Sequence, residues 1–565
     1  MMPHSFEHAL DLVQKGEISA AEPVLQALLR GNPRHFDALH LLGVCRFQAG
    51  DANASEMHLR RALALRPGDA AALANLGNAL RMRGLAMEAL ECFSRACALA
   101  PGLLPARLNR GRLLVEMGRA HEALPELERV LAQEAAHPQA WRWHGLALGQ
   151  LGRLDEAFAS LRRHLQRRAD DAQAWNEAGA LCNALRRYEE AEGSFARAIA
   201  LAPGLDLAHA NRGNALFRLG RFEEARAAYR EALRLAPENA VSRWNLSHVR
   251  LLLGEYEEGF RDYESRWQQV HSENFAPREF FDRPRWQGEE IPGRTILLHA
   301  EQGLGDTILA CRYLARVVPR VGRVLLEVPA PLVRLLARCL EGPVEVLARG
   351  APLPSFDVHC PLLSLPLVFG TTLSTVPSDI PYLHPDPVRE EAWRRELGPA
   401  TRPRVGLAWS GGTDQRFDDE RSIPLEEFHA LAGEGVDFLA VQKELRARDA
   451  AALRQFPALR WFGDSLHDFE DTAALLSCCD LVVSVDTAVA HLAGALARPL
   501  WLIVPFAPDW RWGARGERSA WYPQARILRP PARIAWKPVI AQIAQALHAR
   551  DPDGIGGIAP ASCRN

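Results

Sequence analysis

The first half of the chain repeats one pattern of small and apolar positions at a constant interval. Two sets of glycines mark the pattern, the second set seven residues after the first. The sets are Gly43, Gly77, Gly111, Gly145, Gly179 and Gly213, then Gly50, Gly84, Gly118, Gly152, Gly220 and Gly254. Small residues let two antiparallel helices touch, and the second glycine suits the turn between them. The pattern therefore predicts a stack of helix pairs.

Alanines and prolines complete each unit, with prolines such as Pro67 and Pro101 placed where a second helix must end. The pattern resembles the tetratricopeptide repeat, and we assign residues 1–270 to the array. It has some eight units, the first of them a degenerate one around Ala9 and Ala21. Such arrays commonly hold a peptide or protein segment in a groove, so the resemblance implies a protein partner. An array that only scaffolds or dimerises the chain is the alternative.

Beyond about residue 270 the apolar positions fall in short runs. Runs of strand length, such as TILLHAE, DLVVSV and PLWLIVPF, alternate with helical stretches, which predicts parallel sheets with crossover helices. The expected fold class is an all-α repeat array followed by an α/β region. We place a connector at 271–293, two α/β halves at 294–385 and 402–548, a linker at 386–401 and a tail at 549–565. Ligands usually bind in the cleft between two such halves.

A glycine turn between a predicted strand and a predicted helix carries the first candidate chemistry. It lies in HAEQGLGDTILACRYL, residues 299–314. A dinucleotide fingerprint needs a third glycine where Ile308 stands, so NAD is not expected, although Glu327 imitates the ribose-binding acid. Asp306 lies near the helix start, where a carboxylate caps free N–H groups. On this stretch alone, a cap is favoured over a catalytic carboxylate.

A second helix start follows much later in the chain, in DLVVSVDTAVAHLAGALARPLWLIVPFAPDWRWG, residues 480–513. The strand ends at Val485, and Asp486 and Thr487 open the helix. Thr487 and His491 are four residues apart and share a face, while the free N–H groups at the helix start suit a diphosphate. His491 taken alone reads equally well as a packed helix histidine. The aromatic loop PFAPDWRWG is suited to rim a cleft.

Together these two motifs resemble the bacterial heptosyltransferase family of glycosyltransferases. Residues 486–495, D-T-A-x-x-H-x-A-G-A, look like that family's sugar-nucleotide signature, and G-L-G-D, residues 303–306, is similar to its N-terminal loop. The resemblance covers about residues 294–548. It implies the GT-B architecture of two Rossmann-like halves, and inverting sugar transfer without a catalytic metal. The site roles it implies are Asp306 as general base, Gly303 and Gly305 as the acceptor loop, and Asp486, Thr487 and His491 as donor contacts.

Further residues are candidates for the donor side. Arg421, with Arg416 as second choice, is the candidate that neutralises the departing diphosphate; both read equally well as solvated loop charges. Two turns after predicted strands, VGLAW and DFLAVQ, are placed to face a phosphate or the nucleotide. Their residues are Ser410, Gly411, Gly412, Gln442 and Lys443.

Composition excludes several other classes of function. A formal net charge of −2 over 565 residues gives no support to nucleic-acid binding. No apolar stretch approaches a transmembrane segment and no cleavable signal stands out. We therefore expect a cytoplasmic protein with mostly buried free thiols. No metal cluster is evident, and the D-x-D of Asp551 and Asp553 is expected to be incidental.

The combination of repeats and transferase motifs sets the expected function. Heptosyltransferases lack such an array, and the layout is similar to that of protein O-GlcNAc transferases and bacterial flagellin glycosyltransferases. The resemblance implies transfer from a nucleotide-sugar, with no other cofactor, to a hydroxyl of a protein held by the repeats. A saccharide or lipid-linked acceptor is one alternative. A catalytically silent adaptor is another, against which the retention of Asp306, Asp486, Thr487 and His491 argues. Hexosamine, heptose and nonulosonic acid all fit as the sugar; the last would come from a nucleotide monophosphate, so the donor class stays open.

Overall fold

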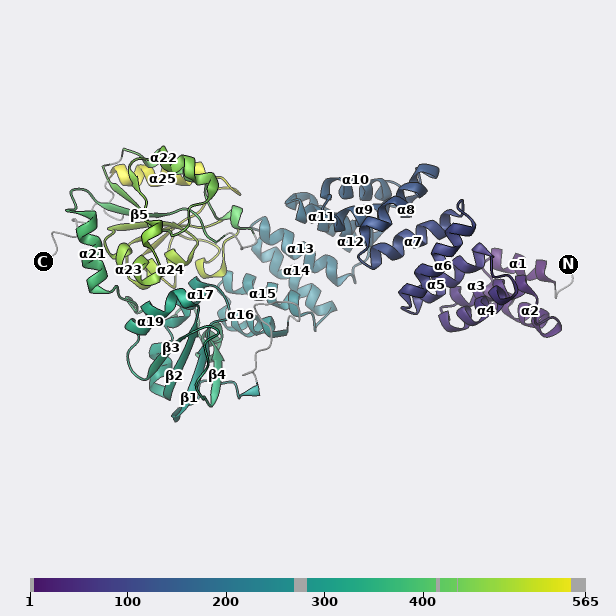
Figure 1. The fold of residues 1–565 in the computed structure, drawn as a ribbon, viewed down its shortest axis with the longest axis horizontal. Helices are drawn as coiled ribbons and strands as arrows, with labels where there is room; N and C mark the ends of the chain where they lie inside the picture. Colours follow the sequence, from purple (N-terminus) through teal and green to yellow (C-terminus); the bar gives the residue numbers. More distant parts are fainter. Residues whose placement is uncertain (1–4, 269–281, 413–416, 434, 550–565) are drawn as a thin grey trace. The chain divides into compact units, whose positions relative to one another are not determined.

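Helices α1 to α16 form the repeat array in the computed structural model (Figure 1). The structure describes residues 5–268, 282–412, 417–433 and 435–549. The chain forms two compact units, Met1–Arg212 and Gly213–Asn565. The helices are α1 Phe6–Gln14, α2 Ile18–Gly31, α3 Phe36–Gln48, α4 Ala52–Leu65, α5 Ala70–Met82, α6 Ala86–Leu99, α7 Leu104–Glu116, α8 Ala120–Gln133, α9 Pro138–Gln150, α10 Leu154–Leu165, α11 Ala172–Ala184, α12 Tyr188–Leu201, α13 Asp206–Arg218, α14 Phe222–Leu235, α15 Ala240–Leu252 and α16 Tyr256–Tyr263. The predicted array is confirmed, including the first pair, in which Ala9 and Ala21 are buried.

The first glycine of a repeat marks the place where two helices touch. A Cβ on Gly77 would lie 2.7 Å from the Phe93 ring, and one on Gly179 would lie 2.6 Å from the Phe195 ring. Both rings are fully buried, so the packing leaves no room for a side chain at either glycine. The second glycines have a positive φ, for example +83° at Gly50, which L-residues with a side chain rarely adopt.

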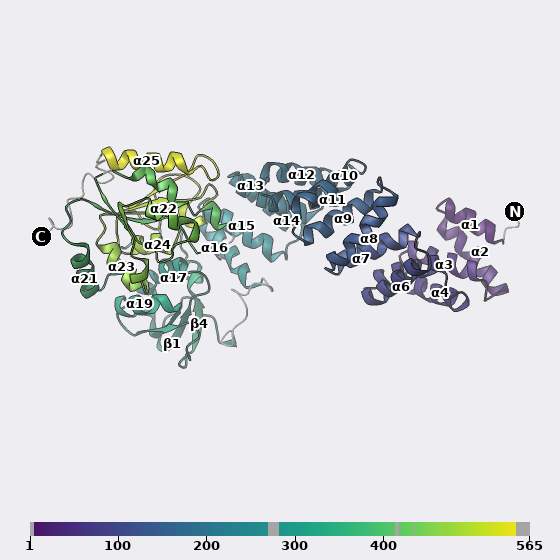
Figure 2. The same ribbon diagram turned by 45° about the horizontal axis from the view of Figure 1, so that its top comes forward.

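The first half of the α/β region is a parallel sheet with strand order β3-β2-β1-β4 (Figure 1). Figure 2 labels its neighbouring strands β1 and β4. On β1, Leu298 stands opposite Leu326 on one neighbour and Cys360 on the other. The strands are β1 Ile291–His299, β2 Val321–Val328, β3 Val344–Ala348 and β4 Val358–Pro361. The helices around it are α17 Leu304–Cys311, α18 Leu314–Val317, α19 Val333–Cys339 and α20 Leu365–Val368. Helix α21, Pro387–Leu397, then occupies most of the stretch that we expected to be a linker.

The second half is a larger parallel sheet with strand order β10-β9-β8-β5-β6-β7. The strands are β5 Arg404–Ala408, β6 Asp437–Ala440, β7 Leu459–Arg460, β8 Leu481–Val485, β9 Leu500–Ile503 and β10 Ala525–Leu528. The helices are α22 Ala450–Arg454, α23 Phe469–Ser477, α24 Ala488–Ala495 and α25 Trp536–Ala549. Both sheets confirm the predicted α/β class. The chain builds this sheet outward from β5 in one direction and from β8 in the other, so the order reverses between these two strands.

The last repeat and the part of the previous one from Gly213 onward belong to the same compact unit as the α/β region and pack against it. Their turn glycines make this contact: a Cβ on Gly220 would meet Phe506 at 3.1 Å, and one on Gly254 would meet Leu373 at 2.7 Å. The equivalent glycines Gly50 and Gly84 have nothing within 4 Å. The end of the repeats is therefore built into the core of the α/β region.

Candidate active site

Two turns meet where the strand order of the six-stranded sheet reverses. The residues after β5, Ser410 and Gly411, lie beside those after β8, Asp486 and Thr487, because β5 and β8 are neighbouring parallel strands. Open α/β sheets bind ligands outside the carboxyl ends of their strands at such a switch point. The sheet thus brings together candidates that are far apart in sequence.

Arg421 joins the two turns. Its Nη1 donates to the backbone carbonyl of Asp486 at 3.1 Å, and its Nε donates to Asp418 at 3.2 Å. A Cβ on Gly411 would overlap the Arg421 guanidinium. With 22% of its side chain exposed, Arg421 is a positioned charge and not a solvated one. Arg416, the second choice, lies outside the described residues.

Gln442 holds the turn after β5 in place. Its Oε1 accepts from the backbone N–H groups of Trp409 at 2.8 Å and Ser410 at 3.1 Å, and its Nε2 donates to the Ser410 hydroxyl at 3.0 Å. Gln442 is buried, whereas Lys443 is exposed and donates to the carbonyl of His467 at 3.1 Å. Gln442 therefore shapes the turn from behind.

Asp486 and Thr487 stand at the start of α24. Thr487 is the N-cap residue, and its side chain makes no capping bond to the helix, so the first N–H groups of α24 are not taken up by it. Burial and nearby Asp509 together raise the pKa of Asp486 to about 6, while Arg421 opposes the shift. The free N–H groups at the start of α24 suit a phosphate-bearing ligand.

His491 packs between the two candidate loops. A Cβ on Gly305 would lie 2.6 Å from the His491 ring, so α17 and α24 touch at this glycine. The ring stacks on Trp512 at 5.0 Å between centroids, and Nδ1 is 3.1 Å from the Tyr522 hydroxyl. Burial and the charge of Arg511 together lower the pKa of His491 to about 3, so the imidazole is neutral at pH 7. In this structure His491 packs the junction of the G-L-G-D and D-T-A-x-x-H motifs.

Asp306 lies in the first turn of α17, and its side chain caps the start of this helix. The backbone N–H of Gly303 donates to its Oδ2 at 2.9 Å, which is the cap that the sequence favours. Its Oδ1 forms an ion pair with Arg511. Burial raises the pKa of Asp306, and Arg511 opposes that shift. The side chain keeps 21% of its surface exposed, so the cap leaves the carboxylate open to a ligand.

Arg511 and Asp509 are the residues of this site that the sequence reasoning missed. Arg511 binds Asp306 and also donates to Asp509 Oδ1, from Nη1 at 2.6 Å and from its backbone N–H at 3.1 Å. Although burial works to raise it, Arg511 lowers the pKa of Asp509. Both residues lie in the aromatic loop DWRW. The sequence did contain a sign of this pair, because an acidic and a basic residue alternate with two tryptophans in the loop that was expected to rim a cleft. A charged side chain that is buried beside tryptophans needs a partner of opposite charge.

The last repeat reaches the same cluster. Gln302, beside the G-L-G-D loop, donates to the Tyr263 hydroxyl at 2.7 Å. The Tyr263 ring lies 5.5 Å from the His248 ring and 6.2 Å from the Trp510 ring, centroid to centroid. His248 has an electrostatic interaction with Asp306, Asp509 and Arg511. In the sequence, repeat residues are interpreted as packing positions or as part of the groove. Nothing in the repeat pattern therefore indicated that Tyr263 and His248 lie at this cluster.

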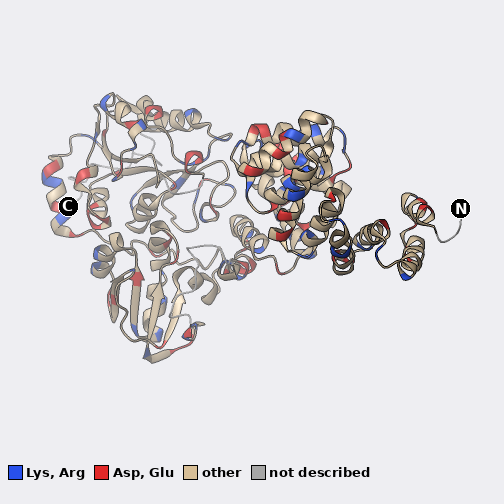
Figure 3. Cartoon of the chain, turned by 45° about the vertical axis from the view of Figure 1, so that its right-hand side comes forward, with Lys and Arg blue, Asp and Glu red and all other residues tan. Residues whose placement is uncertain are grey.

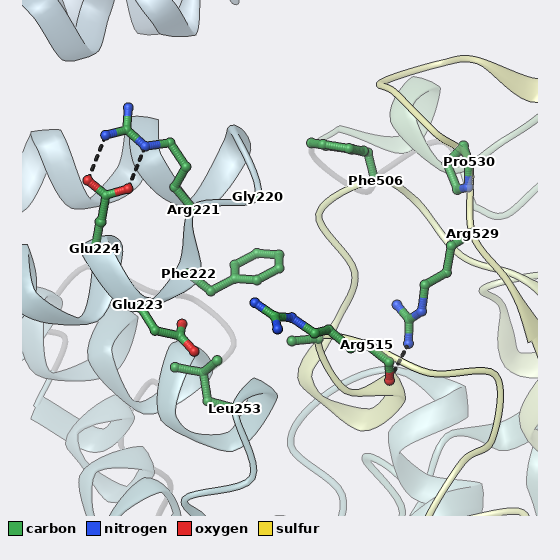
Figure 4. Close-up of a pocket in the computed structure, with 11 residues that line it drawn as sticks. Gly220, Arg221, Phe222, Glu223, Glu224, Leu253, Phe506, Arg515, Arg529 and Pro530 are labelled. Carbon is green, nitrogen blue, oxygen red and sulfur yellow. Dashed lines mark hydrogen bonds and ion pairs between the residues drawn. The ribbon is translucent and has the colours of Figure 1, made fainter.

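A pocket of about 390 Å³ lies on another side of the Arg511 loop, between the start of α14 and the segment after β9 (Figure 4). Phe222 and Phe506 point toward its interior, and Arg515 extends toward Phe222. Arg529 donates to the carbonyl of Trp512 at 2.8 Å and so fastens the loop. The described residues that line this pocket include none of the predicted site residues.

The distribution of charged and metal-binding residues bears on the expectations from composition. Basic and acidic residues are interspersed along the repeat helices (Figure 3). The described residues contain no group of three or more His, Cys, Asp or Glu placed to hold a metal ion. Asp551 and Asp553 lie outside the described residues. No helix in the described part of the chain is long and apolar enough to span a bilayer.

Family models match both parts of the chain. Tetratricopeptide repeat models match residues 6–56, 47–103, 108–172 and 206–239. The model "Glycosyltransferase family 9 (heptosyltransferase)" matches residues 465–503, which contain Asp486, Thr487 and His491 but not Asp306. The chain combines tetratricopeptide repeats with a region similar to family 9 glycosyltransferases. This agrees with the resemblance drawn from the two motifs.

Individual known proteins are similar to parts of this chain. The chain is 28% identical over 318 residues to Protein FlbA of Caulobacter vibrioides, covering 51% of this chain and 52% of FlbA. The chain thus spans about half the length of this curated relative. Solved structures include a tetratricopeptide repeat protein from Parabacteroides merdae, with 18% identity, 42% of this chain and 95% of that chain covered, and a TM-score of 0.35. Another is YrrB, described as a TPR protein with an unusual peptide-binding site, with 21% identity, 33% and 95% covered, and a TM-score of 0.29.

Proposed function

We propose that the protein is an inverting glycosyltransferase of GT-B architecture, which moves a sugar from a nucleotide-sugar to a hydroxyl of a protein recruited by the repeats. One observation supports this most: the G-L-G-D loop and the D-T-A-x-x-H motif, which are far apart in sequence, meet at Gly305 and His491. Asp306 and Asp486, one from each motif, both lie close enough to Arg511 and Asp509 to be affected by their charges. The cytoplasm is the proposed location.

The donor side is the switch point between β5 and β8. The N–H groups at the start of α24 and the guanidinium of Arg421 provide positive potential for the phosphates of the leaving group. Such groups stabilise the charge that develops on departure, which is the task of a metal ion in other transferases. We propose that Thr487, Asp486 and the turn at Ser410 and Gly411 contact the donor, and that no metal ion is needed. His491 and Gln442 hold these elements from behind, and Lys443 lies at the exposed edge.

The acceptor side is the loop that carries Asp306. The acceptor oxygen attacks the anomeric carbon, the bond from that carbon to the nucleotide oxygen breaks, and the leaving nucleotide takes the bonding electrons. The proton of the acceptor hydroxyl passes to the Asp306 carboxylate, which must be ionised to accept it. Gly303 places no side chain beside the carboxylate, where a Cβ would come within 3.2 Å of Oδ2, so an acceptor can reach it. Gly305 leaves room for the His491 ring, which holds the loop against α24.

A labelling experiment tests this proposal and separates the acceptor classes. The full chain and its Asp306→Asn variant are incubated with a lysate that lacks the native protein and with radiolabelled UDP-, GDP-, ADP-, TDP- and CMP-sugars in turn. We expect label in polypeptide with one donor, and none with the variant. Label confined to lipid or saccharide would replace the protein acceptor with the alternative one. Label from no donor would favour a silent adaptor.

A further inference from the structure

Arg511 connects the two halves of the α/β region at the proposed base. Its guanidinium binds Asp306, which is 205 positions earlier in the chain, and Asp509 in its own loop. Only 7% of the Arg511 side chain is exposed. Ion pairs at the surface contribute little, whereas a nearly buried arginine that binds two carboxylates has a fixed geometry.

The loop that carries Arg511 is braced by the last repeat. The backbone N–H of Ala514 donates to the carbonyl of Leu252 at 3.0 Å, and the Trp521 indole donates to the Tyr256 hydroxyl at 3.0 Å. The neighbouring Trp510 is buried and packs edge-on against Phe260 at 5.6 Å. Contacts from α15 and α16 therefore help to fix this loop and the guanidinium that it carries.

Other charged and titratable groups face Asp306 from each element around it. Asp509 faces it from the Arg511 loop, His248 from α15, and Tyr263 from α16. Burial lowers the pKa of His248 and raises that of Tyr263, so both are neutral at pH 7. Asp509 is ionised, which opposes ionisation of Asp306. Among these described groups, Arg511 supplies the positive charge that favours the carboxylate form of Asp306.

We infer that Arg511 is a positioning residue, which keeps Asp306 ionised and oriented so that it receives the acceptor proton. This inference rests on the proposed function. The two oxygens of Asp306 have different neighbours: Oδ2 accepts from Gly303 and Oδ1 meets Arg511. With these two contacts the carboxylate has one orientation. An acceptor hydroxyl then approaches through the exposed part of the side chain.

Loss of Arg511 has a predictable effect on the pH dependence. Asp306 acts as a base only when it is unprotonated, so activity rises with pH as its proton leaves. Without the guanidinium, this positive charge no longer opposes burial and Asp509, which both raise the pKa of Asp306. Asp306 then keeps its proton up to a higher pH. The acid limb of the kcat profile must therefore move to higher pH.

The test is a kcat profile from pH 5 to pH 9 for the wild type, Arg511→Met and Arg511→Lys. Each is assayed with the member of the UDP-, GDP-, ADP-, TDP- and CMP-sugar panel that the wild type uses. We expect Arg511→Met to lose about 100-fold at pH 6 and to recover to within about tenfold at pH 9. Added guanidinium ion restores activity to this variant. Arg511→Lys keeps the charge, so its acid limb stays near that of the wild type while its kcat falls.

The matched control is Arg518→Met, an exposed arginine of the same loop, which leaves the profile unchanged. Melting temperatures show whether each variant folds; if Arg511→Met does not, the Arg511→Lys profile decides. A loss of equal size at every pH, or an Arg511→Lys profile identical to that of the wild type, would overturn the role of Arg511 alone. A wild type that uses no donor would overturn the proposed function, and this role with it.

Discussion

At Asp306 a structural role and the proposed catalytic role fall on the same side chain. The carboxylate caps α17 through Gly303 and pairs with Arg511, and neither contact covers the whole group. A cap and a base are therefore compatible here, which the sequence alone presented as competing interpretations.

Asp306→Asn separates the two roles. Asparagine still accepts from the Gly303 N–H, so the helix start is kept, but it takes no proton. We expect transfer to fall by about 10²–10⁴, with donor affinity within a few-fold of the wild type. Single-turnover rates and donor titrations measure both. Activity within about tenfold of the wild type would leave Asp306 as a cap only.

Glu301, two residues after β1, makes stability depend on pH. It is buried against Arg266, which is itself fully buried, at 3.0 Å. Burial raises its pKa from 4.5 to about 7, more than Arg266 lowers it. The folded state thus holds a proton that the unfolded state releases at lower pH, and this contribution to stability is lost as pH rises toward 7.

We expect the free energy of unfolding to fall by at most about 1.4 kcal/mol per pH unit between pH 5 and pH 7 from this group. Glu301→Gln has no proton that titrates in this range. The difference in the free energy of unfolding between the variant and the wild type should therefore change with pH. Thermal melts at pH 5, 6, 7 and 8 measure it. A difference that is constant over this range would show that Glu301 does not titrate there.

Part of the site could be predicted at this scale, and part could not. Asp306, Asp486, Thr487 and His491 stand in short motifs at helix starts, where local sequence fixes the backbone. Arg511 acquires its role from a partner in the other half of the α/β region, and His248 acquires its place from a repeat that packs against that region. Such long-range pairs leave no mark in spacing or periodicity.

At the scale of elements, the repeat glycines are the feature that the sequence predicts best. Their constant spacing predicted where helices touch, and the packing of Gly179 on Phe195 agrees. Apolar runs predicted the central strands of both sheets, such as β1 and β8, but β3, β4, β7 and β10 were not predicted. The shortest of these, β7, has two residues, Leu459–Arg460, which form no pattern.

Two glycines of one repeat give a matched prediction. Gly179→Ala places a methyl group 2.6 Å from the buried Phe195 ring, and we expect a loss of about 1–3 kcal/mol. Gly193→Ala, at an exposed position of α12 with nothing within 4 Å, should gain about 0.5–1 kcal/mol from helix propensity. Denaturation of the two variants measures this contrast. Equal effects would show that the close helix contact does not exist.

At the scale of the whole molecule, the compact units do not follow the repeat boundary. The sequence predicts an array that ends near residue 270, and the repeats do extend to α16. The second compact unit nevertheless begins at Gly213, because buried residues of α15 and α16, such as Leu252 and Phe260, share the core of the α/β region. Periodicity defines the repeats but not what they pack against.

Truncations test this division. We expect residues 206–565, which contain all of α13 and the whole second compact unit, to fold and remain soluble. Residues 271–565 should aggregate, because the cut exposes the core face that α15 and α16 cover. Size-exclusion chromatography and thermal melts of both fragments measure the difference. A soluble, cooperatively melting 271–565 fragment would contradict the shared core.

The measurement that tests the central claim most directly is thermal-shift binding of the full chain to UDP, GDP, ADP, TDP and CMP. A ligand that binds only the native state raises the melting temperature by mass action. The account predicts a shift with one nucleotide, and loss of that shift in His491→Ala when each protein is compared with its own ligand-free melt. A folded wild type whose melting temperature moves with none of these nucleotides would contradict a donor site at the junction of the two motifs.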